Sequence, residues 1–158
     1  MDSGLLAEKL IEEAALRNVT IALAESCTGG MIAGVLTDVP GASKVFLGSA
    51  VTYSNEAKID ILGVDPDIIN DHGAVSSHCA EKMAEGAKRI FRSEIALSVT
   101  GIAGPDGGSA EKPVGTVWFG ISSNDATYTL KKQFSGERAL IRNSAVKTAL
   151  EALLERVQ

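Results

Sequence analysis

The sequence contains little of what disulfide-rich, zinc-binding and nucleic-acid-binding proteins need. Its 158 residues include two cysteines and two histidines, and aromatic residues make up 4%. Cys27 and Cys79 have neither the close spacing of a zinc site nor the pattern of a disulfide framework, so we predict no metal site. The net charge of −5 argues against nucleic acid as a partner, because phosphate-binding surfaces are normally basic.

Long apolar runs are also missing. No uninterrupted run approaches the roughly 20 residues that cross a membrane. The N-terminus, M-D-S-G-L-L-A-E-K-L, is acidic and amphipathic, whereas a signal peptide is basic and then apolar. We therefore expect no signal peptide, no membrane partner and a cytoplasmic location. The length and the apolar fraction of 45% suit a single domain over 1–158 with an aliphatic, alanine-rich core.

Buried strands and amphipathic helices alternate along the chain. Short apolar runs predict strands, the last two joined as a hairpin, at 19–24, 45–53, 95–101, 115–122 and 127–134. Helical periodicity and capping residues predict helices from the chain start to Asn18, at about 28–38, at 54–62, from Asp65 and Pro66, at about 77–92, and from about Glu137 with Ser135 as its cap. This alternation predicts an α/β fold with three α/β/α layers and a mixed, mostly parallel sheet of about five strands.

Three unusual segments follow the carboxyl ends of the predicted parallel strands. They are E-S-C-T-G-G (25–30), T-Y-S-N-E-A-K (52–58) and T-G-I-A-G-P-D-G-G-S-A-E-K-P-V-G-T (100–116). If these strands are neighbours in one sheet, the three segments converge on one cleft. Because ligands bind at this edge of open α/β sheets, we expect the functional site there.

The first segment places Ser26 just before a predicted helix, which leaves two interpretations open. Ser26 is either an N-cap that satisfies free N–H groups of the first turn or a nucleophile on a strand-to-helix turn. The nucleophile interpretation also needs an exposed hydroxyl, an oxyanion hole and a base. Gly29 and Gly30 could supply the oxyanion hole, because residues without Cβ let a ligand approach backbone donors at a helix N-terminus. The segment is not a G-x-S-x-G elbow, since Ala24 stands in place of the first glycine.

The second segment supplies a candidate base. Lys58 can take a proton from a serine only when its amine is neutral, and both burial and the start of the predicted helix lower the pKa of an amine. Tyr53, at the strand end, could relay a proton or orient the lysine through its hydroxyl. The alternative is that Lys58 is an ordinary solvated surface lysine.

Other groups are weaker candidates. Cys27 is adjacent to Ser26, but its apolar surroundings indicate a packing thiol and not a nucleophile. His72 is predicted to end a helix before Gly73, and His78 to lie in the first turn of the next, so Ser-His-Asp chemistry is not favoured. The glycine-rich third segment matches neither a P-loop nor a dinucleotide fingerprint.

Long stretches of the sequence resemble one known family, the CinA C-terminal domain. They are A-E-S-C-T-G-G, V-T-Y-S-N-E-A-K, H-G-A-V-S and S-V-T-G-I-A-G-P-D-G-G-S-x-E-K-P-V-G-T-V-W-F, and the likeness continues to F-S-G-E-R and the last helix. The resemblance implies the family's fold and hydrolysis of the carboxamide of nicotinamide mononucleotide (NMN) to nicotinate mononucleotide and ammonia. It implies a Ser/Lys mechanism without metal or other cofactor, with Ser26 as nucleophile, Lys58 as base and Tyr53 as supporting hydroxyl. The N-terminal domain of full-length CinA proteins is not expected here.

With NMN as the small-molecule partner, the segments suggest further roles. Backbone N–H groups near Thr28, Gly29 and Gly30 are expected to hold the oxyanion. Asn55 could bind the ribose or the carboxamide. The 5′-phosphate is expected against the 100–109 segment and the last helix, with candidates Thr100, Gly101, Gly104, Arg138 and Arg142.

A different class of function stays open at this point. The domain could bind a pyridine nucleotide without turning it over, as a sensor or part of an assembly, with Ser26 only a cap. Ammonia release separates the two functions. The apolar content of the helices at both chain ends also suggests a homodimer.

Overall fold

A mixed sheet of five strands forms the middle of the molecule. The computed structural model describes residues 1–158, and the strand order is β2-β1-β3-β4-β5. The strands are β1 (Ile21–Glu25), β2 (Phe46–Val51), β3 (Ile95–Gly101), β4 (Thr116–Ser123) and β5 (Thr127–Gln133). β1 is parallel to β2 and β3, whereas β4 is antiparallel to β3 and β5. Four strands therefore run one way and one the other, which confirms the predicted mostly parallel sheet.

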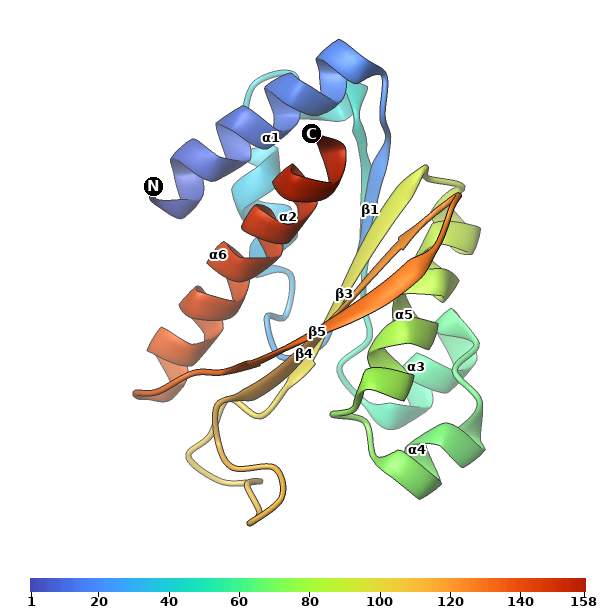
Figure 1. The fold of residues 1–158 in the computed structure, drawn as a ribbon, viewed down its shortest axis with the longest axis vertical. Helices are drawn as coiled ribbons and strands as arrows, with labels where there is room; N and C mark the ends of the chain where they lie inside the picture. Colours follow the sequence, from blue (N-terminus) through green and yellow to red (C-terminus); the bar gives the residue numbers. More distant parts are fainter.

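Helices cover both faces of this sheet, so the three predicted layers are confirmed (Figure 1). One face carries α1 (Ser3–Arg17), α2 (Met31–Thr37) and α6 (Arg138–Val157). The other carries α3 (Asn55–Leu62), α4 (Pro66–His72) and α5 (Ser77–Phe91). A short 3-10 turn, Ala42–Lys44, precedes β2. No helix in the structure is both long and apolar enough to cross a membrane.

The two faces of the sheet carry side chains of different size. Along β1, Ile21 and Leu23 join the large aliphatic core under α1, α2 and α6, whereas Ala22 and Ala24 join the smaller cluster under α5. Successive strand residues face opposite sides, so this alternation follows directly from the sequence. The small residues let α5 lie close to the sheet: a Cβ added to Gly120 in β4 would lie 2.3 Å from the Ala80 carbonyl oxygen.

Several helix ends match the prediction and two differ. Asn18 ends α1 in the left-handed conformation, and Asp65 caps α4 by accepting from the N–H of Asp67. Ser135 is not the cap of the last helix: Glu137 holds that position and its side chain makes no capping bond. The helix predicted at about 28–38 begins only at Met31, because the preceding residues form a turn with two glycines at positive φ.

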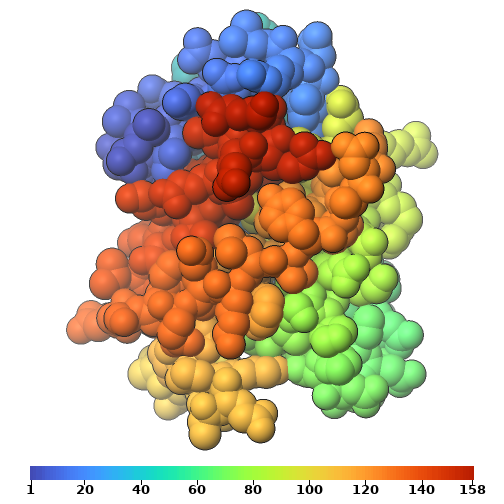
Figure 2. Space-filling model, in the orientation of Figure 1, coloured from blue at the N-terminus to red at the C-terminus, as the bar shows by residue number.

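The carboxyl ends of β1, β2 and β3 lie at one edge of the sheet. Glu25, the last residue of β1, is in register with Val51 of β2 and Val99 of β3. The glycine-rich loop over residues 102–115 leaves β3 at the same end and projects from the body of the molecule (Figure 1, Figure 2). The three segments singled out in the sequence thus start from one edge.

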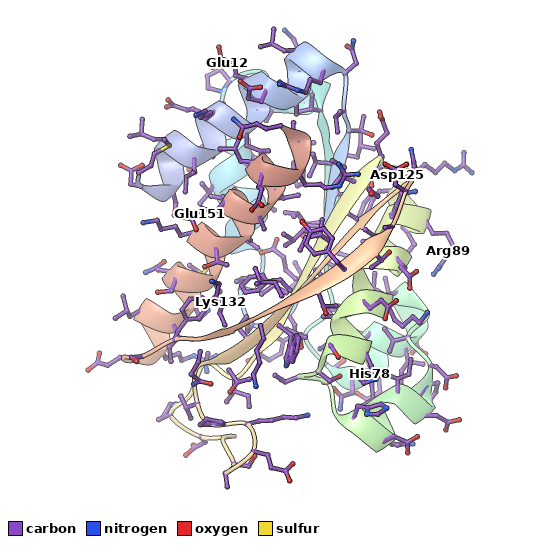
Figure 3. All side chains as sticks on the ribbon, in the orientation of Figure 1. Glu12, His78, Arg89, Asp125, Lys132 and Glu151 are labelled. Carbon is purple, nitrogen blue, oxygen red and sulfur yellow. The ribbon has the colours of Figure 1, made fainter.

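Charged side chains gather on the outside of the layers. Figure 3 shows Glu12 on α1 and Glu151 on α6 pointing away from the sheet, and Asp125 at the β4–β5 turn. Arg156 on α6 pairs with Asp125 at 3.4 Å. The three ion pairs of the structure involve only such surface residues, so none of them accounts for the arrangement of the sheet edge.

Two helical glycines provide a test of the close packing between α3 and α5. A Cβ at Gly86 would lie 2.2 Å from the Leu62 carbonyl oxygen, whereas a Cβ at Gly34 in α2 would meet nothing within 4 Å. We expect Gly34→Ala to raise the free energy of unfolding by about 0.5–1 kcal/mol and Gly86→Ala to lower it by about 1–3 kcal/mol. Urea unfolding of both variants checks this. Equal stabilisation by the two changes would contradict the close α3–α5 contact.

Candidate active site

The three sequence segments meet in a pocket of about 250 Å³ at the carboxyl edge of the sheet. Its walls come from the ends of β1 and β3, the start of α3, the segment before α5 and the start of α6. The lining residues are Ser26, Cys27, Tyr53, Asn55, Lys58, Ala74, Val75, Thr100, Gly101, Ala103 and Arg138. Arg138 and Lys58 are the only basic residues of the lining, and no aspartate or glutamate is among them.

Lys58 is buried at the bottom of this site with 2% of its surface exposed. Its Nζ lies 2.9 Å from Ser26 Oγ, 2.9 Å from the Thr52 carbonyl oxygen and 3.0 Å from the Tyr53 carbonyl oxygen. No carboxylate pairs with it. The structure therefore excludes the solvated surface lysine that the sequence left open.

Burial lowers the pKa of Lys58 from its ordinary value of 10.5, because desolvation disfavours the ammonium form. The nearby sulfur atoms of Cys27 and Cys79 do not counter this strongly. Burial raises the pKa of each thiol to about 11, so both are uncharged near neutral pH. The amine is thus surrounded by neutral groups.

The three partners of Lys58 Nζ fix the direction of its lone pair. Carbonyl oxygens can only accept hydrogen bonds, so Thr52 and Tyr53 take two N–H bonds of a neutral amine. The third position around the nitrogen is then the lone pair, and Ser26 Oγ lies there at 2.9 Å. In this state the serine hydroxyl donates to the lysine, which is the arrangement of a nucleophile and its general base.

Ser26 is held by its backbone in the turn between β1 and α2. Its N–H donates to the Val99 carbonyl at 3.0 Å, and its carbonyl accepts from the Gly29 N–H at 3.1 Å. Its hydroxyl bonds Lys58 and caps no helix, because Gly30 is the N-cap of α2 and supplies no side chain. The N-cap interpretation of Ser26 is therefore wrong.

Glu25 is the residue of this site that sequence reasoning missed. Its carboxylate is fully buried. It accepts from Thr28 Oγ1 at 2.8 Å, Ile32 N at 2.9 Å, Ala33 N at 3.2 Å and Ser49 Oγ at 2.7 Å. The signal in the sequence was a charged residue at the end of an otherwise apolar strand.

The expected oxyanion donors need correction. The N–H of Gly29 is already bonded to the Ser26 carbonyl, and the pocket lining does not include Thr28, Gly29 or Gly30. The N–H groups of Cys27, Thr28 and Gly30 have no hydrogen-bond partner within the chain. Among these, only Cys27 lines the pocket, so its N–H replaces the predicted donors as the candidate for the oxyanion.

The two arginines of α6 have different roles. Arg142 does not line the pocket: its Nε donates to the Cys27 carbonyl at 3.0 Å and its Nη2 to the Thr28 carbonyl at 3.3 Å. The expectation that Arg142 binds substrate is therefore not supported, because it holds the serine turn from behind. Arg138 does line the pocket, and its Nη1 donates to the Gly104 carbonyl at 2.8 Å.

The Tyr53 hydroxyl does not reach the Ser26–Lys58 pair. The side chain is 63% exposed, and its hydroxyl lies 3.4 Å from Arg138 Nη2 at the mouth of the pocket. Tyr53 orients Lys58 through its main-chain carbonyl instead. The predicted relay through the hydroxyl differs from the structure because the side chain at the strand end turns toward solvent.

The remaining predicted residues lie around the pocket with different functions. Asn55, Thr100 and Gly101 line it, and Thr100 Oγ1 donates to the Ala74 carbonyl at 3.0 Å, which joins two walls. Gly104 lies outside the lining and acts as the acceptor for Arg138. The rings of His72 and His78 stack 3.7 Å apart away from the pocket. No cluster of three His, Cys, Asp or Glu side chains could hold a metal ion.

Comparison with known proteins identifies close relatives of this chain. The family model for the CinA C-terminal domain matches residues 4–157. A competence-damage inducible protein of Caldicellulosiruptor bescii is 47% identical over 157 residues, which is 99% of this chain and 38% of that relative. A CinA-like protein of Thermotoga maritima is 48% identical over 137 residues, or 87% of this chain and 33% of that relative. The chain thus spans about a third of the length of these curated relatives.

Solved structures share the whole fold. The crystal structure of the competence/damage inducible protein CihA from Agrobacterium tumefaciens is 42% identical with a TM-score of 0.97, and the match covers 100% of this chain and 97% of that chain. A CinA superfamily protein from Escherichia coli is 32% identical with a TM-score of 0.94, covering 98% of this chain and 90% of that chain. The predicted fold class is therefore confirmed.

The state of the two thiols tests the electrostatics of the site. With a pKa of about 11 for Cys27 and Cys79, roughly one thiol in a thousand or fewer is ionised at pH 7.5, and only the thiolate is alkylated. We expect both to react with iodoacetamide at least a hundredfold more slowly in the native protein than in urea. Cys27→Ala should leave any activity of the site within about threefold. Rapid alkylation of Cys27 in the native protein would contradict a raised thiol pKa and would favour Cys27 as the nucleophile.

Proposed function

The chain belongs to the CinA C-terminal domain family, and we propose that it is a nicotinamide-nucleotide amidohydrolase. The proposed reaction hydrolyses the carboxamide of NMN to nicotinate mononucleotide and ammonia, with Ser26 as nucleophile and Lys58 as general base. We propose that the reaction needs no metal or other cofactor.

The observation that carries this proposal is the contact between Lys58 Nζ and Ser26 Oγ at 2.9 Å, with the other two positions of the amine occupied by carbonyl oxygens. Burial of a lysine without an anionic partner costs free energy. A binding site gains nothing from an amine directed at a hydroxyl. A hydrolase gains an activated serine.

The proposed chemistry uses one proton carrier. Lys58 takes the Ser26 hydroxyl proton as Oγ attacks the carboxamide carbon, and the resulting ammonium donates to the Thr52 and Tyr53 carbonyls. The oxyanion accepts from the Cys27 N–H. Lys58 then gives its proton to the departing amide nitrogen, which leaves as ammonia. Water attacks the acyl-serine, and Lys58 takes one proton from that water. Lys58 returns this proton to Ser26 Oγ as the C–O bond breaks, and the carboxylic acid that leaves ionises in solvent to nicotinate mononucleotide.

The lining residues suggest how the nucleotide lies. A pocket of about 250 Å³ is smaller than most small-molecule sites, so it suits the pyridine ring and part of the ribose. The phosphate would then lie at the mouth, where the exposed guanidinium of Arg138 is the available cation. Asn55 and Tyr53 at the same mouth offer an amide and a hydroxyl for the ribose.

Two further parts of the proposal concern location and assembly. Both free cysteines are buried and unpaired, which is typical of a reducing compartment, so we place the enzyme in the cytoplasm. Homodimerisation is proposed on the exposed side chains Leu47 and Val51 of the edge strand β2, because edge strands with exposed apolar residues favour pairing between chains.

Ammonia release from NMN in the presence of EDTA tests the activity. We expect turnover by the wild type and a loss of about 10²–10⁴-fold in kcat for Ser26→Ala, Lys58→Ala and Lys58→Arg. Lys58→Arg is the matched control, because arginine keeps a positive charge but cannot become neutral. Circular dichroism confirms that each variant is folded. NMN binding by the wild type without ammonia release would instead support the non-catalytic binding domain, and phosphate release would support neither.

The pH profile tests the protonation state of Lys58. Because its folded pKa is lowered, kcat/KM should rise as pH increases through that value, with a midpoint below 10.5. The free energy of unfolding should also depend on the protonation of Lys58. Between the lowered pKa and 10.5, the unfolded state binds a proton that the native state lacks. The free energy of unfolding therefore falls as pH falls across this window. Subtracting the pH profile of Lys58→Met isolates that slope. A midpoint at or above 10.5 would exclude Lys58 as the base.

A further inference from the structure

We propose that Glu25 is a positioning residue, whose carboxylate fixes the serine turn so that the Ser26 hydroxyl meets the Lys58 amine. This inference rests on the proposed Ser/Lys chemistry. Glu25 touches neither the pocket nor the reacting atoms, and it acts through its neighbours.

The Glu25 carboxylate joins three separate pieces of structure. Oε1 accepts from Thr28 Oγ1 and Ile32 N, and Oε2 accepts from Ala33 N and Ser49 Oγ. The turn, the first turn of α2 and strand β2 are thereby bonded to one side chain. No arginine, lysine or histidine pairs with Glu25, so these four donors are the hydrogen-bond partners of its side chain.

The main chain of Glu25 also reaches the lysine. The Thr52 N–H donates to the Glu25 carbonyl at 2.9 Å, and the Thr52 carbonyl accepts from Lys58 Nζ at 2.9 Å. Ser26 follows Glu25 directly in the chain. One residue therefore sets the position of the nucleophile on one side and of a carbonyl that orients the base on the other.

The hydrogen-bond pattern requires a carboxylate and not an amide. Each oxygen accepts from one hydroxyl and one backbone N–H. A hydroxyl can rotate to accept a bond from an amide nitrogen, but a backbone N–H cannot. Glutamine in either orientation would place its NH₂ against the N–H of Ile32 or of Ala33. One end of α2 would have to move, and the serine turn with it.

The role assigned to Glu25 is geometric, which separates it from a role in proton transfer. Burial lowers the pKa of Lys58, opposed only by the sulfur atoms of Cys27 and Cys79. Loss of the Glu25 carboxylate should therefore reduce the rate at every pH and leave the midpoint of the pH profile unchanged.

Phosphorylation of Ser26 by diisopropyl fluorophosphate measures the reactivity of the serine hydroxyl without NMN. In this reaction Ser26 Oγ bonds to phosphorus, fluoride leaves, and the hydroxyl proton passes to Lys58. Intact-mass and peptide analysis give the rate and the site. We expect Glu25→Gln to lower the rate at Ser26 by tenfold or more, since a shift of about 1 Å can cost 10²-fold. Glu25→Asp, which keeps both acceptor oxygens, should lie between Glu25→Gln and wild type.

A matched control separates positioning from general loss of stability. Asp65 caps α4 by accepting from Asp67 N at 2.9 Å and lies outside the pocket. Asp65→Ala should lower the melting temperature and leave the labelling rate unchanged. If Glu25→Gln does not fold, the labelling rate of Glu25→Asp is compared with those of the wild type and Asp65→Ala, and this comparison tests the proposal.

The outcomes divide clearly. Slower labelling of the Glu25 variants with an unchanged pH midpoint supports the proposal. Wild-type rates in both variants, an equal loss in Asp65→Ala, a shifted midpoint, or no labelling of wild-type Ser26 would overturn it. Because labelling does not involve NMN, a wild type that labels at Ser26 but releases no ammonia removes the proposed activity and leaves this inference standing.

Discussion

The arrangement of the site depends on one buried amine. Lys58 has 2% of its surface exposed and no anionic partner, so its position is favourable only because two carbonyl oxygens and one hydroxyl satisfy it. The carbonyls belong to the segment that leaves β2, and Ser54 at the end of that segment caps α3 by accepting from Ala57 N at 3.1 Å. The strand end, the cap and the first turn of α3 together hold the amine at the foot of the pocket.

The two faces of the sheet contribute differently to stability and to the site. The face under α1, α2 and α6 carries the large aliphatic core, and burial of that apolar surface supplies most of the stability. The opposite face carries small residues such as Ala22 and Ala24, so α5 and α3 lie close. The desolvated space into which Lys58 extends is at this second face. The site is tied to the first face as well, because α2 and α6 hold the serine turn through Glu25 and Arg142.

Local sequence patterns predicted the fold well, and the site only in part. Short apolar runs, helical periodicity and capping residues located the five strands and the six α-helices, because these signals are local, but not the 3-10 turn Ala42–Lys44. The meeting of Ser26 and Lys58 followed from the parallel strands, whose carboxyl ends share an edge. The direction of the Tyr53 hydroxyl, the contact of Arg142 with the Cys27 carbonyl, and the role of Glu25 were not predictable. These contacts join side chains to groups on other elements or turns, so they depend on how α2 and α6 pack and have no periodic signal.

The same physical cause favours serine over the neighbouring cysteine as the proposed nucleophile. Desolvation disfavours whichever form is charged, so one environment lowers the pKa of Lys58 and raises that of Cys27 to about 11. A thiolate–ammonium pair would need both groups charged at rest. A hydroxyl and a neutral amine need no charge until the attack begins. In the proposed reaction, charge then develops as an ammonium between two carbonyl oxygens and as an oxyanion for which the Cys27 N–H is the candidate donor. A buried pair without an anionic partner therefore favours the proposed Ser/Lys chemistry over a cysteine nucleophile in this turn.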